Sequence, residues 1–348
     1  MVELETFLGI DYPTLWYLVV GLLFSGYAIL EGFDYGAGAW HLFLKKDLSR
    51  RIAINAIGPL WDANQVWLII GGGALFAGFP VMYATMLSAM YIPFMLFLVL
   101  LVLRSSAIKF RSSEEMIWWR KTWDIIYFIS NTLIAFLLGV VLGNVLQGFE
   151  IGENFSYKGG IFFAFLSPYA IMVGFTTLSI FMTQGAIFLL LKTEGRLYAR
   201  LTFLLKKGMI FFIISFAVTS LYTLVFLPGV TDKFKEYPVF FILPILAFLA
   251  VANVPRLVSK KKYANELVFL SLTMAFLLML VAFQLYPVLL PSSIDPKFSV
   301  TIYNAASSQK SLGIMLTIVV IGAPLLAGYF LFLYKTFHGK VKLDDTSY

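Results

Sequence analysis

The sequence predicts an all-α integral membrane protein with nine transmembrane helices. Of its 348 residues, 60% are hydrophobic and only 13% are charged, and the mean hydropathy is +0.87. A soluble domain is typically about 45–50% apolar and about 25% charged. The apolar residues form long runs, and a helix needs roughly 20 such residues to cross a bilayer. The length of the chain therefore sets a number of spans rather than of globular domains.

Nine apolar runs are long enough to be these spans. In chain order they cover 13–43, 53–78, 80–103, 122–146, 161–191, 208–228, 238–255, 265–289 and 312–335. We expect Phe79-Pro80 to make the turn between the second and third spans. Gly58-Pro59 predicts a kink within the second span, because proline removes a helical hydrogen bond.

The distribution of basic residues predicts how the chain is oriented. The first, third, fifth and seventh connections and the C-terminal tail hold all but five of the 26 lysines and arginines. The five exceptions are Lys158, Lys233, Lys235, Lys297 and Lys310. By the positive-inside rule, the N-terminus is expected outside and the C-terminus in the cytoplasm. The net positive charge is thereby assigned to topology, so membrane lipid is an expected partner and nucleic acid is not.

Ligands for metals and haem are scarce. The absence of cysteine excludes disulfides and thiolate metal sites. The two histidines, His41 and His338, do not suggest a pair of axial haem ligands. We expect His41 to be an interfacial side chain at the inner end of the first span, and Asp124 to pair with Arg120 and Lys121. No metal, haem or catalytic residue is assigned to this chain.

Three acids lie well inside predicted spans: Glu31, Asp34 and Asp62. At about 1.5 Å of rise per residue, Asp34 and Asp62 both lie roughly 15 Å from the inner ends of their helices. Because these helices are antiparallel neighbours, we expect the two aspartates to meet at one level. Glu31 precedes Asp34 by three residues and shares its helical face.

We interpret the three acids as a file of carboxyls that opens to the cytoplasm and passes protons, since buried carboxyls can exchange protons near neutral pH. Trp61, Asn64, Gln65 and Trp67 are the expected supporting residues. Two alternatives remain open for the cluster. It could be a packing site with Asp62 hydrogen-bonded to its neighbours, or a sodium site made of carboxylate and amide oxygens.

A faint internal repeat suggests how the spans are grouped. The segment GAGAWHLFLKKD ends the first span, and the similar segment QGAIFLLLKTE ends the fifth. Two repeats of four helices and a ninth helix would explain this likeness. We accordingly divide the chain into a first bundle with the polar cluster (1–150), a second bundle (151–290), and a peripheral helix with a cytoplasmic tail (291–348).

Several motifs resemble subunit II of the cytochrome bd quinol oxidases, also called cytochrome d ubiquinol oxidase subunit 2. They are GFDYGAG (32–38), RRIAINAIGPLWDANQVWLIIGGGALFAGFPVMYA (50–84), RKTWD (120–124), GNVLQG (143–148) and MTQGA (182–186). The motifs cover the first half of the chain densely and in order. The second half is similar only in hydropathy and in the number of spans.

The resemblance implies a fold of two four-helix bundles plus one peripheral helix, in the bacterial cell membrane. It implies a haem-free partner of subunit I, which carries haem b and haem d, oxidises quinol, reduces oxygen to water and thereby builds a proton gradient. By the same resemblance, Asp34 and Asp62 belong to a hydrophilic channel from the cytoplasm, and Glu31 stands where relatives often have another acid. A bound quinone and a small single-helix accessory subunit are left open.

Two other functions remain open at this stage. One is an ion-coupled membrane transporter in which Asp34 and Asp62 bind the ion. The other is a purely structural partner subunit whose acids are inert. In the preferred hypothesis the chain is part of a quinol:oxygen oxidoreductase and is not catalytic alone.

Overall fold

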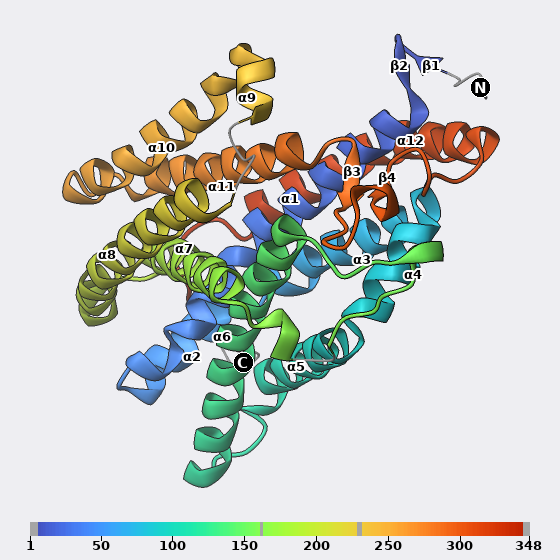
Figure 1. Ribbon diagram of the computed structural model, residues 1–348. Coiled ribbons are helices and arrows are strands. Elements are labelled where there is room, and N and C mark those ends of the chain that lie inside the picture. The colour runs from blue at the N-terminus through green and yellow to red at the C-terminus, as the bar shows by residue number, and fades with distance from the viewer. Residues whose placement is uncertain (1–5, 161–162, 228–231, 344–348) are drawn as a thin grey trace.

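The computed structural model describes residues 6–160, 163–227 and 232–343, and most of this chain is helical (Figure 1). The long helices are α1 (Tyr12–Ala39), α3 (Trp61–Gly78), α5 (Tyr91–Phe110), α6 (Ile117–Gln147), α7 (Pro168–Lys192), α8 (Gly195–Phe226), α10 (Ile242–Ser259), α11 (Tyr263–Leu285) and α12 (Gln309–Thr336). The short helices are α2 (Asp47–Ile57), α4 (Pro80–Ala89) and α9 (Asp232–Glu236).

Short 3₁₀ helices and strands connect these elements. The 3₁₀ helices are η1 (His41–Phe43), η2 (Glu153–Phe155), η3 (Phe163–Phe165), η4 (Pro238–Phe241) and η5 (Pro296–Phe298). The strands form two antiparallel pairs, β1 (Thr6–Phe7) with β2 (Ile10–Asp11) and β3 (Val288–Leu290) with β4 (Val300–Thr301). Both pairs lie outside the long helices.

Within the described residues, eight helical segments are long and apolar enough to cross a membrane, and there are nine if α3 and α4 count as one bent span. The all-α membrane fold class is therefore confirmed. The bend between α3 and α4 is 116° and falls at Phe79, directly before Pro80, where the turn was predicted. Two predicted spans, 161–191 and 208–228, include residues outside the described part of the chain.

Two predicted spans are interrupted. The Gly58-Pro59 kink is a complete break, because residues 58–60 form a turn that ends α2 and lets α3 begin at Trp61. The predicted span 80–103 divides at Met90 into α4 and α5, and α5 continues to Phe110. The first break places Asp62 in the first turn of α3 rather than inside a continuous helix.

Helices α1 and α7 approach each other closely at two glycines. A Cβ atom at Gly36 would lie 1.7 Å from the carbonyl oxygen of Phe181, and one at Gly185 would lie 2.2 Å from the backbone nitrogen of Ala37. No larger residue fits either position without moving a backbone, as is common where membrane helices cross. Gly36 and Gly185 belong to the two repeat segments, so these segments contact each other inside the molecule.

Most of the basic residues gather at one end of the molecule, which we call the basic end. It comprises residues 40–51, 109–121, 192–207, 256–263 and 335–342. Their mutual contacts are Arg111 Nη2 to Asp47 (2.5 Å), Arg200 Nη2 to the Phe43 carbonyl (3.3 Å), Val341 N to the Lys192 carbonyl (3.0 Å), and the rings of Tyr198 and Tyr263 (6.0 Å). The alternation of charge along the sequence thus corresponds to a shared location in space.

Helix α12 returns along α1 and is attached at both of its ends. At the end away from the basic end, Trp16 Nε1 donates a hydrogen bond to the carbonyl of Leu312 at 3.0 Å. In its last turns, Tyr334 donates to Asn64 at 2.9 Å. The C-terminal helix thereby contributes a side chain to the interior of the first half of the chain.

Candidate functional site

Two carboxylates and one guanidinium form the centre of the candidate site. Glu31 and Asp34 lie one turn apart on the same face of α1, as predicted from their spacing. Arg104 of α5 donates from Nη1 to Glu31 Oε1, and its Nη2 lies 3.8 Å from Asp34 Oδ2. All three side chains are 0% exposed, so water does not screen their interactions from outside.

Polar side chains from α3 and α12 hold the Asp34 carboxylate from the other side. Asn64 Nδ2 of α3 donates to Asp34 Oδ2 at 2.9 Å and to the carbonyl of Leu30 at 3.2 Å. Tyr334 of α12 donates to the remaining Asn64 oxygen. The amide is thereby fixed with its nitrogen toward the acid. Four helices, α1, α3, α5 and α12, supply this site.

Aromatic rings enclose the guanidinium. The Arg104 Cζ atom lies 4.6 Å from the ring centroid of Tyr35 and 5.9 Å from that of Trp61. Contacts of this kind favour a cation in a site that excludes water. The hydroxyls of Tyr35 and Tyr27 are 2.5 Å apart and bond each other. Trp61, one of the predicted supporting residues, therefore belongs to this enclosure.

The site keeps polar atoms that the described residues do not satisfy. Glu31 Oε2, Asp34 Oδ1 and Arg104 Nε are buried without a hydrogen-bond partner in the described part of the chain. Buried polar groups are nearly always bonded to protein or to ordered water. Each carboxyl therefore has an oxygen that can bind a proton or a water molecule while the other oxygen is held.

Asp62 does not meet Asp34, and the prediction that it would was wrong. The Asp62 side chain is exposed on this chain, whereas Asn64 is fully buried and contacts Asp34. Residues two apart on a helix point in nearly opposite directions, so α3 can turn only one of these two polar residues toward α1. The amide takes that place, and the acid faces outward.

The other two supporting residues also lie away from the acids. Gln65 and Trp67 line an apolar crevice of about 2920 Å³ that extends from α1 and α3 to α8, α10 and α11. The ring of Trp67 packs against Gly26 and against Phe330, whose ring centroid is 5.4 Å away. These residues contribute to packing and to the wall of the crevice.

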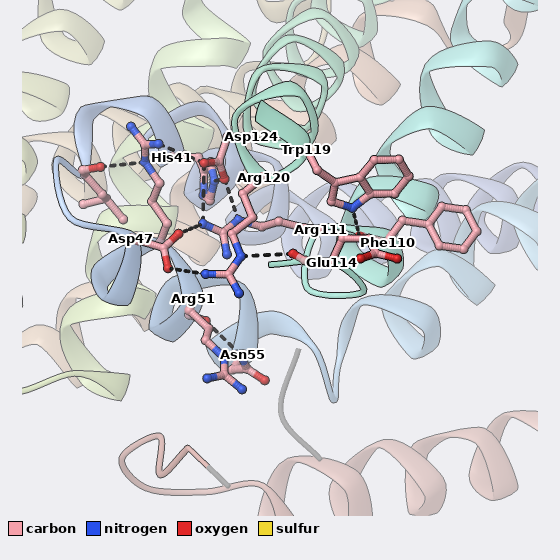
Figure 2. A network of polar contacts seen from close by, with 12 residues as sticks. His41, Asp47, Arg51, Asn55, Phe110, Arg111, Glu114, Trp119, Arg120 and Asp124 are labelled. Carbon is pink, nitrogen blue, oxygen red and sulfur yellow. Dashed lines mark hydrogen bonds and ion pairs between the residues drawn. The ribbon is translucent and has the colours of Figure 1, made fainter. Parts of the chain in front are cut away.

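A second polar network lies at the basic end and was not predicted (Figure 2). His41 Nε2 is 2.5 Å from Asp124 Oδ1, and Asp124 also accepts from Arg111 Nε at 2.6 Å and from Arg50 Nη1 at 2.8 Å. Arg111 reaches onward to Asp47 at 2.5 Å. This network links η1, α2, the C-terminal end of α5 and α6.

The expectations for His41 and Asp124 are corrected accordingly. His41 is 0% exposed rather than interfacial, and Asp124, at 2% exposure, pairs among the described residues with His41, Arg50 and Arg111 instead of Arg120 and Lys121. Burial lowers the pKa of His41 below its ordinary value, so the imidazole is neutral near pH 7. Its other nitrogen, Nδ1, is buried without a partner among the described residues.

Arg104 was overlooked for a physical reason. The positive-inside rule treats a basic residue after an apolar run as a loop residue. Arg104 directly follows such a run but lies within α5, which continues to Phe110. The sequence signal for Arg104 was the pair of acids in the first predicted span, Glu31 and Asp34, because a buried acid requires a compensating cation.

A sodium ion is disfavoured at this site. In the described part of the chain, no group of three or more histidine, cysteine or acidic side chains is arranged to hold a metal ion. The guanidinium 3.8 Å from Asp34 would repel a cation, and the amide oxygen of Asn64 already accepts from Tyr334. The two acids are instead bonded to Arg104 and Asn64.

Comparison with known proteins gives consistent matches. The family model described as cytochrome bd terminal oxidase subunit II matches residues 12–337. The chain is 32% identical to cytochrome bd-I ubiquinol oxidase subunit 2 of Escherichia coli K12, with 97% of each chain covered. It is also 32% identical to cytochrome bd ubiquinol oxidase subunit 2 of Bacillus subtilis 168, with 94% of this chain and 96% of the relative covered.

The fold has a solved counterpart. A chain of the bd oxidase from Geobacillus thermodenitrificans matches with a TM-score of 0.77 and 20% identity, covering 94% of this chain and 98% of the other. At that identity the likeness concerns the fold. It extends over the second half of the chain, where the sequence motifs were sparse.

Proposed function

The chain belongs to the family of cytochrome bd terminal oxidase subunit II, and from that premise we propose that it is a haem-free subunit that delivers protons from the cytoplasm. In this proposal subunit I oxidises quinol and reduces oxygen to water at haem b and haem d. Reducing oxygen to water consumes protons, and taking them from the cytoplasm generates a gradient. The part needed from a haem-free subunit is a protonatable path through the apolar interior.

The observation that carries the proposal is the charge balance of the buried site. Two ionised carboxylates beside one guanidinium would leave an uncompensated negative charge in the protein interior, which is costly. One proton shared between Glu31 and Asp34 makes the site neutral. A site that holds one exchangeable proton between two acids is suited to receive and pass on protons one at a time.

The histidines support a haem-free role. Haem iron is usually held by His, Met, Cys or Tyr side chains. The chain has no cysteine, and His41 is held against Asp124 through Nε2. The other histidine, His338, lies just beyond α12. No haem chemistry is therefore assigned to this chain.

The direction of delivery follows from the basic end. Cytoplasmic connections of membrane proteins are enriched in lysine and arginine, so we take the basic end as cytoplasmic and the N-terminus as external. Asp62, which is exposed on this chain, is retained in the proposal as an acid that would face the partner subunit or water. The family match over residues 12–337 favours the oxidase subunit over an ion-coupled transporter.

The test is Asp34→Asn in the assembled complex with subunit I. We expect quinol-driven oxygen consumption to fall while the haem bands of the reduced-minus-oxidised spectrum remain. Asp295→Asn is the matched control, because it makes the same chemical change at a partly exposed site far from the acids. Asp62→Asn tests the exposed acid in the same way.

The opposite result is equally informative. If the Asp34→Asn complex retains both its haem bands and the parental rate, then Asp34 does not carry protons. The purely structural role then becomes the better description of this chain. A loss of haem bands together with the rate would report failed assembly, and Glu31→Gln would then be measured in its place.

A further inference from the structure

We propose that His41 is the proton-loading residue through which the buried acids are supplied from the basic end. The inference deepens the proposed function and rests on it. It assigns the His41–Asp124 pair, which sequence reasoning treated as interfacial, to the delivery path. Four observations carry it: the link of the pair to the surface, the partial offset of charge around His41, its position relative to Asp34, and the unsatisfied polar atoms between them.

The network connects His41 to the aqueous side. His41 itself is buried, but the Asp47 side chain is 52% exposed and the Arg50 side chain is 20% exposed. Figure 2 shows Asp47 in the cluster around Asp124 and Arg111, and Arg50 donates to Asp124 at 2.8 Å. Asp124 therefore connects the imidazole to a side chain, Arg50, that reaches the surface.

Two acids, Asp124 and Asp47, offset part of the arginine charge around a neutral His41 ring. The groups that face it are Asp124 and Tyr127 from α6, Arg111 from the end of α5, and Arg50 from α2. Asp47 accepts from Arg111 and also lies 3.5 Å from Arg120. A proton added to His41 adds to the positive charge of the cluster, so the imidazolium is short-lived.

His41 lies in η1, directly beyond the C-terminal end of α1, and follows Asp34 of α1 by seven residues. Gly38 lies between them, and a Cβ atom there would be 2.2 Å from the side chain of Asn131 on α6. The α6 residues that cover this interval are therefore Tyr127, whose ring is 5.0 Å from that of His41, and Asn131.

The interval contains polar atoms that neither helix satisfies. His41 Nδ1, Tyr127 Oη, Asn131 Oδ1 and Asp34 Oδ1 are all buried without a partner in the described residues. Tyr127 also lies close enough to Glu31, Asp34 and Arg104 to interact with them electrostatically. Buried groups of this kind are commonly bridged by ordered water, which would complete a path from the imidazole to the carboxyl.

The transfer step is balanced in protons. In the resting state His41 carries its hydrogen on Nε2 and donates it to the Asp124 carboxylate. Nδ1 is the ring nitrogen without a partner among the described residues, and it accepts a proton that ordered water carries in from the basic end. Asp124 stabilises the resulting imidazolium through Nε2, as a buried aspartate does for a catalytic histidine. The Nδ1–H bond then breaks as the proton passes to water on the side of Tyr127 and Asp34, and the neutral ring is restored. Asp124 acts as a positioning residue in this step.

The test is His41→Gln in the complex with subunit I, measured as proton uptake during a single oxygen turnover. Glutamine can still donate to Asp124 but cannot carry a proton at neutral pH. We expect uptake to slow roughly tenfold or more, as when a positioned acid–base group is lost. The control Thr183→Val changes a fully buried hydroxyl of α7 that bonds only to the Ser179 carbonyl among the described residues, and uptake should stay at the parental rate.

The pH profile separates loading from a structural role. Loading requires His41 to take a proton, so uptake in the parent should rise as the pH falls from about 6.5, the ordinary histidine pKa, toward the lowered pKa of His41. The Gln variant should lack this rise, whereas Thr183→Val should keep it. A Gln variant with the parental rate and profile would overturn the proposal.

Two comparisons keep the conclusions distinct. If Asp34→Asn slows oxygen consumption while His41→Gln takes up protons normally, then the acids are supplied by another route and only this inference fails. If both variants behave as the parent, the proposed function fails with it. Should His41→Gln not assemble, Tyr127→Phe removes a single hydroxyl from the interval, and normal uptake in that variant would equally overturn the inference.

Discussion

Replacing Arg104 by glutamine tests the charge balance of the buried site through stability rather than activity. The Arg104, Glu31 and Asp34 side chains are all 0% exposed, so solvent does not reduce the effect. Removing one partner of a buried ion pair costs about 3–5 kcal/mol, because an uncompensated charge is left behind. At roughly 2–4 °C per kcal/mol, Arg104→Gln should lower the melting temperature by on the order of 10 °C.

Asp34→Asn should be much milder. It leaves Glu31 and Arg104 as a neutral pair, and it weakens only the hydrogen bond from Asn64, which is worth about 1–3 kcal/mol. The double variant Glu31→Gln/Arg104→Gln should lose less stability than the two single variants together, since residues of one buried network couple by about 0.5–3 kcal/mol.

The assay heats the purified complex and follows the surviving size-exclusion peak by tryptophan fluorescence and haem absorbance. The expected order of melting temperatures is parent, Asp34→Asn, then Arg104→Gln well below both. An Arg104→Gln complex that melts at or above Asp34→Asn would refute the charge balance described for this site. The shared proton would then lose its basis, whatever the activity measurements gave.

Three further predictions follow from other parts of the molecule. Gly36→Ala should destabilise the fold by about 1–3 kcal/mol or more through its clash with the Phe181 carbonyl, whereas Gly73→Ala, which has open space around it, should melt like the parent. Glu266→Leu should raise the free energy of unfolding by about 1–3 kcal/mol, because both oxygens of this fully buried acid lack a partner among the described residues. A melting temperature below that of the parent would show that the carboxyl has a partner in the complex. Burial lowers the pKa of His41 in the folded chain, so the unfolded chain binds that proton more readily, and stability falls as the pH drops from about 6.5 toward the lowered value. His41→Gln should flatten this acid-side loss in melting curves recorded across that range, and an unchanged slope would contradict the assignment.

Much of the fold could be predicted because it depends on local patterns. Apolar runs identified the membrane helices, proline marked the bend before α4 and the break before α3, and the motifs of the first half identified the family that the match over residues 12–337 confirms. The pairing of Glu31 with Asp34 on one face also follows from their spacing alone.

The remainder depends on the direction in which each side chain points. Depth along the helix placed Asp62 and Asp34 at one level, but only the rotation of α3 decides that Asn64 faces α1 and Asp62 does not. That rotation is set by packing against several helices at once. Arg104 was missed similarly, since counting positive charges says on which side of the membrane a residue lies and not whether it points outward or into the protein.

The positive charge of the basic end has two opposite effects on a proton-delivering subunit. A surface rich in lysine and arginine favours retention on the cytoplasmic side, yet a positive field opposes the entry of protons. Around His41 this conflict is reduced locally, because Asp124 and Asp47 lie within hydrogen-bond distance of Arg50 and Arg111 and offset their charges. The imidazole therefore occupies a patch that is less positive than the surface around it. A proton can reach this patch without crossing the full field, and the arginines can still orient the chain.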